Sequence, residues 1–328
     1  MQKIKVLFIR PWKSSFIQND LEILRKHFDV KVLDWKGIKN PRYSVELFRK
    51  ILWADITFSW FAGPHAFWVT RLSKILGKKS IVVVGGYEVA KVPEIDYGAM
   101  LNPKSAHQVR YILKNADKIL AVSKFSEDEI LQYTHPKNVD LIYNGIDCDK
   151  FKPESKKENS VITVAYAISH DAIKVKGLKT FIKSAEYLPN TNFLVIGELL
   201  DSSAECLKTT ASSNVEFCRF VPEGEVVKYY QKARVYCQLS FRESFGMSLA
   251  EAMACECVPV VTNRGALPEV VGETGVYVPY GDPKATAEAI KKALKLDKGK
   301  EARERIKRMF SLEKREKRLV SIIEDMGV

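Results

Sequence analysis

The stretch at residues 242–269, RESFGMSLAEAMACECVPVVTNRGALPE, predicts a loop, a helix, a buried strand, a glycine-containing loop and a second short helix. Ser244, Phe245 and Gly246 are expected to open the first helix, whose mostly apolar side chains indicate that it is buried. Residues 258–261 are all apolar and are typical of a strand inside a parallel sheet. This order of elements predicts an α/β fold.

Two carboxylates flank the start of that helix, because Glu243 precedes it and Glu251 follows eight positions later. The first N–H groups of a helix can hold phosphate or a sugar hydroxyl, and Gly246 lets a ligand approach the backbone closely. Ser248 and Glu251 also match a capping box, which would make Glu251 structural. The local residues leave both interpretations open.

The pattern of Glu243, seven residues, Glu251, and then EAMAC, PVV and G-x-x-PE resembles the donor-site signature of the family 4 glycosyltransferases with the GT-B fold. The resemblance implies that Glu243 lies beside the transferred sugar and that Glu251 hydrogen-bonds to the nucleotide ribose. It also implies that the backbone N–H groups of Phe245 and Gly246 contact the sugar or the phosphate. The donor-binding candidates here are Ser244, Phe245, Gly246 and Glu251.

The length of 328 residues suits two domains. Apolar residues make up 46% and charged residues 28%, as in soluble globular proteins. No apolar run is long enough to span a bilayer, and the start MQKIKVLFIRPW predicts a strand and not a signal peptide. All six cysteines follow position 147 without metal-ligand spacing. We therefore expect a cytoplasmic protein with reduced thiols, no metal site and no cofactor.

The net charge of +12 is concentrated near the C-terminus. Residues 291–318 hold 13 Lys or Arg against 5 Asp or Glu, which leaves +8. Such a region is usually solvated surface, and the alternative is attraction to anionic lipid, which would place the protein at the inner membrane face. Aromatic interleaving and a recognisable module are lacking, so nucleic acid is not an expected partner.

The first half of the chain alternates strand-like and helical segments, which indicates a doubly wound parallel sheet. The strands are predicted at residues 5–9, 30–33, 56–59, 79–84, 118–122 and 139–142. Ligands in such sheets collect at the carboxyl ends of strands, and strand 79–84 runs directly into four candidate residues for the acceptor side. These are Gly85, Gly86, Tyr87 and Glu88, although Gly-Gly is also typical of a plain tight turn.

This half departs from the family at two points. Many members carry Gly-Gly in the first loop near the donor phosphates, where this chain has Lys13 and Ser14, and Lys13 is a candidate to supply charge instead. Several relatives also place a histidine beside the reacting sugar, near residues 85–88. That role is vacant here or passes to Tyr87, Glu88 or His107.

Residues 143–153, YNGIDCDKFKP, resemble the phrase that joins the two domains in the family. We therefore expect an N-terminal acceptor-side domain at 1–153, a nucleotide-sugar donor domain at 154–310, and a helix at 311–328 that crosses back to the first domain. Asp147 and Asp149 also match the metal-binding D-x-D motif of the other class of glycosyltransferases, GT-A. The flanking residues favour the linker.

The second half contains three lysines, at 174, 176 and 179, before or within a helix predicted to begin near Gly177. A lysine beside a helix start can hold a diphosphate, and Lys176 matches the family's lysine for that group. The family's usual arginine is missing, and Lys174 or His170 is a candidate to replace it. Phe220 and Val221 are further donor-binding candidates, because they belong to a turn that the family places against the base, where Arg219 replaces a glycine.

The resemblance thus predicts two Rossmann-like domains facing a cleft and a retaining, metal-independent glycosyltransferase. Glu243 and Lys176 are the catalytic candidates, a nucleotide-sugar is the donor, and the acceptor is a glycan, a lipid or a small molecule. The alternative is a GT-B protein that binds a nucleotide-sugar or glycan without turnover. An epimerase or phosphorylase on the same fold is a third hypothesis.

Overall fold

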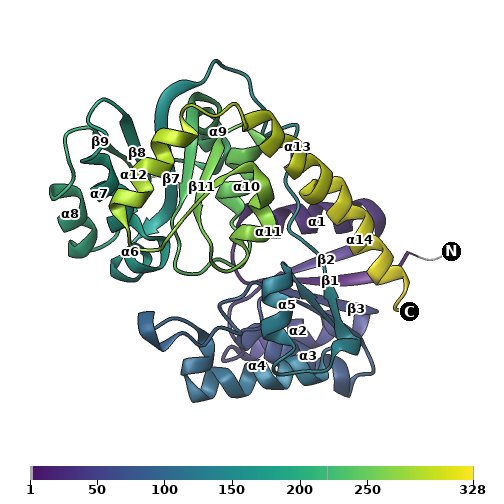
Figure 1. Ribbon diagram of the computed structural model, residues 1–328. Coiled ribbons are helices and arrows are strands. Elements are labelled where there is room, and N and C mark those ends of the chain that lie inside the picture. Colours follow the sequence, from purple (N-terminus) through teal and green to yellow (C-terminus); the bar gives the residue numbers. More distant parts are fainter. Residues whose placement is uncertain (1–2, 220, 328) are drawn as a thin grey trace. The chain divides into compact units, whose positions relative to one another are not determined.

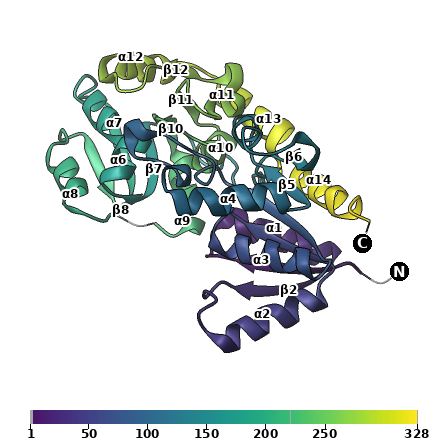
Figure 2. The same cartoon turned by 90° about the horizontal axis from the view of Figure 1, so that it is seen from below.

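The computed structural model describes residues 3–219 and 221–327. The chain divides into two compact units, one made of Met1–Gly145 with Leu312–Val328 and the other of Ile146–Ser311. Each unit is built on a six-stranded parallel sheet with helices packed against it (Figures 1 and 2). The α/β fold with two doubly wound domains is therefore confirmed.

The sheet of the first unit has the order β2-β1-β3-β4-β5-β6. Its strands are β1 (Lys5–Arg10), β2 (Asp29–Asp34), β3 (Ile56–Trp60), β4 (Lys79–Val84), β5 (Lys118–Ala121) and β6 (Val139–Leu141). Its helices are α1 (Ser15–His27), α2 (Pro41–Trp53), α3 (Pro64–Ile75), α4 (Pro103–Asn115), α5 (Lys124–Ile130) and α14 (Leu312–Glu324), with short 3-10 turns at Pro93–Ile95, Ala99–Leu101 and Pro136–Asn138. Helices α2, α3 and α4 cover one face through the buried apolar side of each helix.

The sheet of the second unit has the order β12-β11-β10-β7-β8-β9. Its strands are β7 (Glu158–Ile168), β8 (Asn192–Leu199), β9 (Val215–Cys218), β10 (Ala233–Gln238), β11 (Val258–Thr262) and β12 (Val276–Val278). Its helices are α6 (His170–Lys176), α7 (Leu178–Ala185), α8 (Ser202–Thr209), α9 (Glu223–Lys232), α10 (Met247–Ala254), α11 (Leu267–Val271), α12 (Pro283–Ala293) and α13 (Gly299–Phe310), with a 3-10 turn at Gly272–Thr274. The core lies between the sheet and α7, α8 and α12 on one face, and α9 and α10 contact the strands as well.

Each sheet contains one point where the chain reverses its direction of travel across the strands. The reversal falls between β1 and β3 in the first unit and between β7 and β10 in the second. Connections leave such a pair of strands toward opposite sides, so the carboxyl ends of the two strands stay open to a ligand. The fold therefore marks one candidate edge in each unit.

The C-terminal helix α14 belongs to the first unit, where it packs beside α1 (Figure 1). Its buried Arg315 contacts the equally buried Asp20 of α1 through two bonds of 2.5 and 2.7 Å. The Trp60 indole donates to the same carboxylate at 2.9 Å. The predicted return of the final helix to the first domain is confirmed.

The basic region at 291–318 is not the uniformly solvated face that its charge predicts. Six of its 13 cationic side chains bind other groups of the chain. Arg303 donates to the carbonyls of Cys148, Phe151 and Ala254. Arg305 donates to those of Glu269 and Val270. The others are Lys298, Lys307, Arg315 and Arg318.

The cysteines are all free thiols, and three of them, Cys237, Cys255 and Cys257, are buried. Burial raises the pKa of each of these three thiols. No group of three or more His, Cys, Asp or Glu within 3–219 and 221–327 is placed to hold a metal ion. None of the helices in this described part is long and apolar enough to cross a membrane.

The buried ion pair between α1 and α14 predicts a large stability difference between two arginines of one helix. Arg315→Ala removes the buried ion-pair partner of Asp20 and is expected to lower the free energy of unfolding by about 3–5 kcal/mol. Arg318→Ala removes an exposed partner of Asp140 and is expected to cost about 1 kcal/mol or less. Urea denaturation followed by circular dichroism measures both, and equal losses would contradict the assignment.

Candidate functional site

The open edge of the second unit lies where β7 and β10 end. After β7 the chain forms α6, which ends at Lys176, and Gly177 follows with a φ of 66° before α7 begins at Leu178. Residues 170–176 therefore form a short helix of their own, ahead of the helix predicted to begin near Gly177. After β10 the chain forms the loop that carries Glu243. The strand order brings these two segments together.

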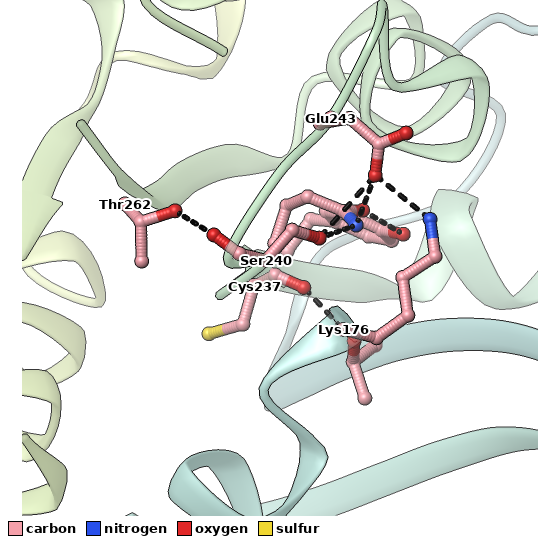
Figure 3. A network of polar contacts seen from close by, with 8 residues as sticks. Lys176, Cys237, Ser240, Glu243 and Thr262 are labelled. Carbon is pink, nitrogen blue, oxygen red and sulfur yellow. Dashed lines mark hydrogen bonds and ion pairs between the residues drawn. The ribbon is translucent and has the colours of Figure 1, made fainter. Parts of the chain in front are cut away.

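Lys176 and Glu243 form an ion pair of 2.7 Å between Nζ and Oε2, with side chains 33% and 15% exposed (Figure 3). The same Oε2 accepts from the Gln238 amide at 3.1 Å and from the Ser240 hydroxyl at 3.3 Å. Gln238 is oriented in turn by donating to Ser240 at 2.8 Å and accepting from the Tyr236 hydroxyl at 3.1 Å. Three donors therefore fix one oxygen of Glu243.

The backbone around this network is tied to neighbouring strands. Thr262 at the end of β11 donates to the carbonyl of Ser240 at 2.6 Å, and Thr163 of β7 donates to that of Cys237 at 2.9 Å (Figure 3). The other oxygen of Glu243, Oε1, receives no hydrogen bond from the residues that the structure describes. The carboxylate is thus rigidly placed and keeps one acceptor atom for a ligand.

Helix α10 begins at Met247, so the prediction that Ser244, Phe245 and Gly246 open it is wrong by one to three residues. Gly246 has a φ of 93°, which excludes it from a right-handed helix and makes it the residue before the first turn. Gly246 has no side chain with which to cap the turn that follows. Phe245 is buried with its ring 5.5 Å from that of Phe310, and Ser244 is half-buried.

Glu251 lies inside α10 and is 3% exposed. The hydroxyl of buried Tyr230 donates to its Oε2 at 3.4 Å. Ser248 is not at the cap position, so the capping-box interpretation of Glu251 is wrong. Burial raises the pKa of Tyr236, and the nearby carboxylates of Glu243 and Glu251 raise it further. Tyr236 therefore lies within electrostatic range of both acidic residues.

The three lysines predicted to hold the diphosphate, at 174, 176 and 179, do not line one common site. Lys174 and Lys179 line a groove of about 770 Å³ formed by α6, α7 and α8, whereas Lys176 points to Glu243. The backbone carbonyl of Lys174 accepts from the Tyr280 hydroxyl at 2.7 Å. His170 is exposed and lines the same groove. Among the base-side candidates, Val221 is buried, and Phe220 lies outside the described residues.

Sequence reasoning missed Gln238, Ser240 and Tyr230, which hold the two carboxylates. It also missed Arg264, whose guanidinium lies 4.2 Å from the ring centre of Phe241 in the loop after β10. Gln238 is a buried polar residue that ends a core strand, and this was the one available signal for it. Arg264 carries no comparable signal.

The open edge of the first unit is organised by Glu88, which is 5% exposed. Its carboxylate accepts from the backbone N–H groups of Ala62 at 3.0 Å, Gly85 at 3.1 Å and Gly86 at 2.9 Å. Burial raises the pKa of Glu88, while these N–H groups act in the opposite direction. Glu88 thus ties the loop after β3 to the loop after β4.

The other candidates of this edge lie nearer the surface. Tyr87 is 54% exposed and meets the ring of Tyr97 edge-on at 5.1 Å. Lys13 is exposed, whereas Ser14 precedes α1 and keeps its buried Oγ without a hydrogen-bond partner among the described residues. Gly85 is needed because an added Cβ would lie 2.4 Å from the Phe61 ring. His107, on α4, is exposed.

The D-x-D sequence at residues 147–149 stabilises a turn. One carboxylate oxygen of Asp147 accepts from the backbone N–H groups of Asp149 at 3.0 Å and Lys150 at 2.9 Å. An aspartate that closes its own turn in this way is typical of a loop. The geometry therefore agrees with the interpretation of this segment as a linker.

Comparisons with known proteins connect this geometry to a family. The profile described as "Glycosyltransferase Family 4" matches residues 2–150, and that described as "Glycosyl transferases group 1" matches residues 148–309. A phosphatidylinositol N-acetylglucosaminyltransferase subunit of Arabidopsis thaliana is 26% identical over 69% of this chain and 54% of its own length. The capsular polysaccharide biosynthesis glycosyltransferase CapM of Staphylococcus aureus is 32% identical over 51% of this chain and 49% of its own. The chain thus spans about half the length of these relatives.

A solved structure has a similar fold. The Anabaena protein HepE in complex with UDP and glucose superposes with a TM-score of 0.81 and 15% sequence identity. The superposition covers 98% of this chain and 99% of that protein. The predicted GT-B type of fold is therefore confirmed.

The glycine that supports the Glu243 loop provides a test of this geometry. Gly265 has a φ of 58°, and an added Cβ would lie 2.3 Å from the carbonyl oxygen of Glu243. Gly281 has a similar φ of 82° but no atom within 4 Å of an added Cβ. Gly281→Ala is expected to destabilise by about 1–2 kcal/mol, and Gly265→Ala by roughly 1–3 kcal/mol more because the loop must shift. Urea denaturation compares them, and equal costs would show that Gly265 does not support the loop.

Proposed function

Because the chain belongs to the family of group 1 and family 4 glycosyltransferases, we propose that it transfers a sugar from a nucleotide-sugar donor to an acceptor, with retention of the anomeric configuration and without a metal ion. The ion pair between Lys176 and Glu243 at the strand reversal is the observation that carries the proposal. It brings a cation and a carboxylate to the edge where open α/β sheets bind ligands.

The proposed reaction breaks the bond between the sugar and the diphosphate. Negative charge then grows on the diphosphate, and positive character grows at the anomeric carbon. Lys176 and the first N–H groups of α10 would hold the diphosphate. Lys176 is two-thirds covered by protein, so its attraction to that charge is screened less than it would be in bulk water.

Glu243 would orient the transferred sugar. Its Oε2 is already held by three donors, so Oε1 is the atom offered to a sugar hydroxyl. On donor binding, the Lys176 ammonium is expected to bridge Glu243 and the diphosphate. Glu251 is the proposed partner of the ribose, and its burial would strengthen that hydrogen bond. Ser244, Phe245 and Gly246 would contribute their backbone to the donor.

The acceptor would lie at the edge of the first unit, near Gly85, Gly86, Tyr87 and Glu88. We propose a glycan, lipid or small-molecule acceptor, with Glu88 shaping the loops rather than contacting it, since both of its oxygens accept backbone N–H groups. Lys13 remains a candidate for additional charge near the donor. The alternative function is binding of a nucleotide-sugar without turnover.

Substitution of Glu243 tests the catalytic part of the proposal. A thermal-shift screen against UDP-, GDP-, ADP- and dTDP-sugars identifies the donor, and release of the nucleotide diphosphate then measures its hydrolysis or transfer. Glu243→Gln keeps the shape of the side chain but loses its charge, and we expect the rate to fall about 100-fold or more. Glu288→Gln, at an exposed site on α12, is the matched control and should keep the full rate.

Two outcomes decide against the catalytic role. An unchanged rate in Glu243→Gln would remove Glu243 from the mechanism. A donor that shifts the melting temperature of the native protein, but is neither hydrolysed nor transferred, would favour the non-catalytic alternative. Circular dichroism of the variant establishes that a lost rate does not come from unfolding.

Charge neutralisation by Lys176 predicts that chelators leave the rate unchanged. We expect dialysis against EDTA to preserve turnover, because the lysine and the α10 N–H groups replace a metal ion at the diphosphate. Lys176→Met should lower donor affinity about tenfold or more. Loss of activity in EDTA, with recovery on addition of Mg²⁺ or Mn²⁺, would overturn metal independence while leaving the sugar transfer itself in place.

A further inference from the structure

Helix α2 of the first unit carries apolar side chains on the face that points away from the sheet. Val45, Phe48 and Leu52 are 51%, 42% and 48% exposed. They are spaced three and four residues apart, so they lie along one stripe of the helix. Single exposed apolar residues are common on protein surfaces, but three aligned on one helix form a continuous apolar strip.

The opposite face of α2 holds the helix firmly in place. Tyr43, Leu47 and Ile51 are buried in a cluster that includes residues of β1, β2 and α3. Asn40 caps the first turn by accepting from two backbone N–H groups, and Pro41 is the first helical residue. The exposed strip is therefore part of a rigid, fully packed helix and not of a frayed segment.

Cations flank the strip on one side. Arg42 and Arg49 are both exposed, and their spacing from Val45 and Leu52 places them beside the apolar side chains. Neither guanidinium has an ion-pair partner in the described part of the chain. The helix's acidic residue, Glu46, is bound to Lys50 at 2.7 Å. The strip is thus bordered by two uncompensated positive charges.

We propose that α2 docks the protein on the surface of an anionic phospholipid bilayer. The apolar strip would enter the boundary between headgroups and acyl chains, and Arg42 and Arg49 would contact lipid phosphates. An apolar face combined with cations and no uncompensated acid matches such a surface. The basic region at 291–318 lacks this combination, because Met309 is its one large exposed apolar side chain among the described residues.

Flotation with vesicles tests the proposal without any sugar donor, so its result does not depend on the proposed function. The probe is vesicles of phosphatidylcholine with about one third phosphatidylglycerol, compared with pure phosphatidylcholine. We expect binding to the anionic vesicles that weakens as salt is raised. Phe48→Asp with Leu52→Asp should reduce it about tenfold or more, and Arg42→Ala with Arg49→Ala by roughly five-fold per arginine.

Matched controls separate α2 from other surfaces. Leu200→Asp changes a leucine that is 55% exposed in the second unit, and Lys291→Ala with Lys292→Ala removes two exposed cations of the basic region. Both should leave vesicle binding unchanged. Binding that survives the α2 changes, or is lost in the controls, would overturn the proposal. So would a dimer in light scattering that Phe48→Asp dissociates, because a second copy would then cover the strip.

Discussion

Parallel strands deliver all their carboxyl ends to one edge of a sheet, and the reversal of strand order opens that edge at one point. In the second unit this constraint joins Lys176 and Glu243, which are 67 residues apart in the chain. β10 supplies Gln238 and leads to Ser240, which both donate to the Glu243 carboxylate, while Thr262 of β11 holds the backbone carbonyl of Ser240 in place. The chemistry of the site therefore follows from the order of the strands as much as from the residues themselves.

The elements of the sheets were readable from local pattern, but their contacts were not. The strand Lys79–Val84 agrees with its prediction at both ends, because a valine-rich run is bounded by lysines and by Gly-Gly. The start of α10 was misplaced because the positive φ of Gly246 leaves no trace in apolar periodicity. Tyr230 and Gln238 reach the two glutamates through packing, and no spacing rule relates residues that meet only in the folded chain.

The predicted charge of residues 291–318 was also misleading, because the contacts of the cationic side chains cannot be predicted from sequence pattern. The count of cations in residues 291–318 indicates an open basic face, yet the guanidinium groups of Arg303 and Arg305 donate to backbone carbonyls. These bonds satisfy peptide groups that would otherwise need water or another partner. A net charge from composition therefore overstates the field available to a partner. The contacts that each arginine makes, rather than the number of arginines, distinguish a structural arginine from one that faces solvent.

The pairing of Asp20 with Arg315 also bears on synthesis of the protein. Translation delivers Asp20 early, but its partner emerges after the whole of Ile146–Ser311. The two residues lie 295 positions apart in the chain, so at the usual speed of ribosomes the aspartate waits about fifteen to sixty seconds for Arg315. The nascent first unit must stay incomplete during that interval, with the surface destined for α14 open to chaperones. Maturation of the first unit is thereby coupled to the synthesis of α14.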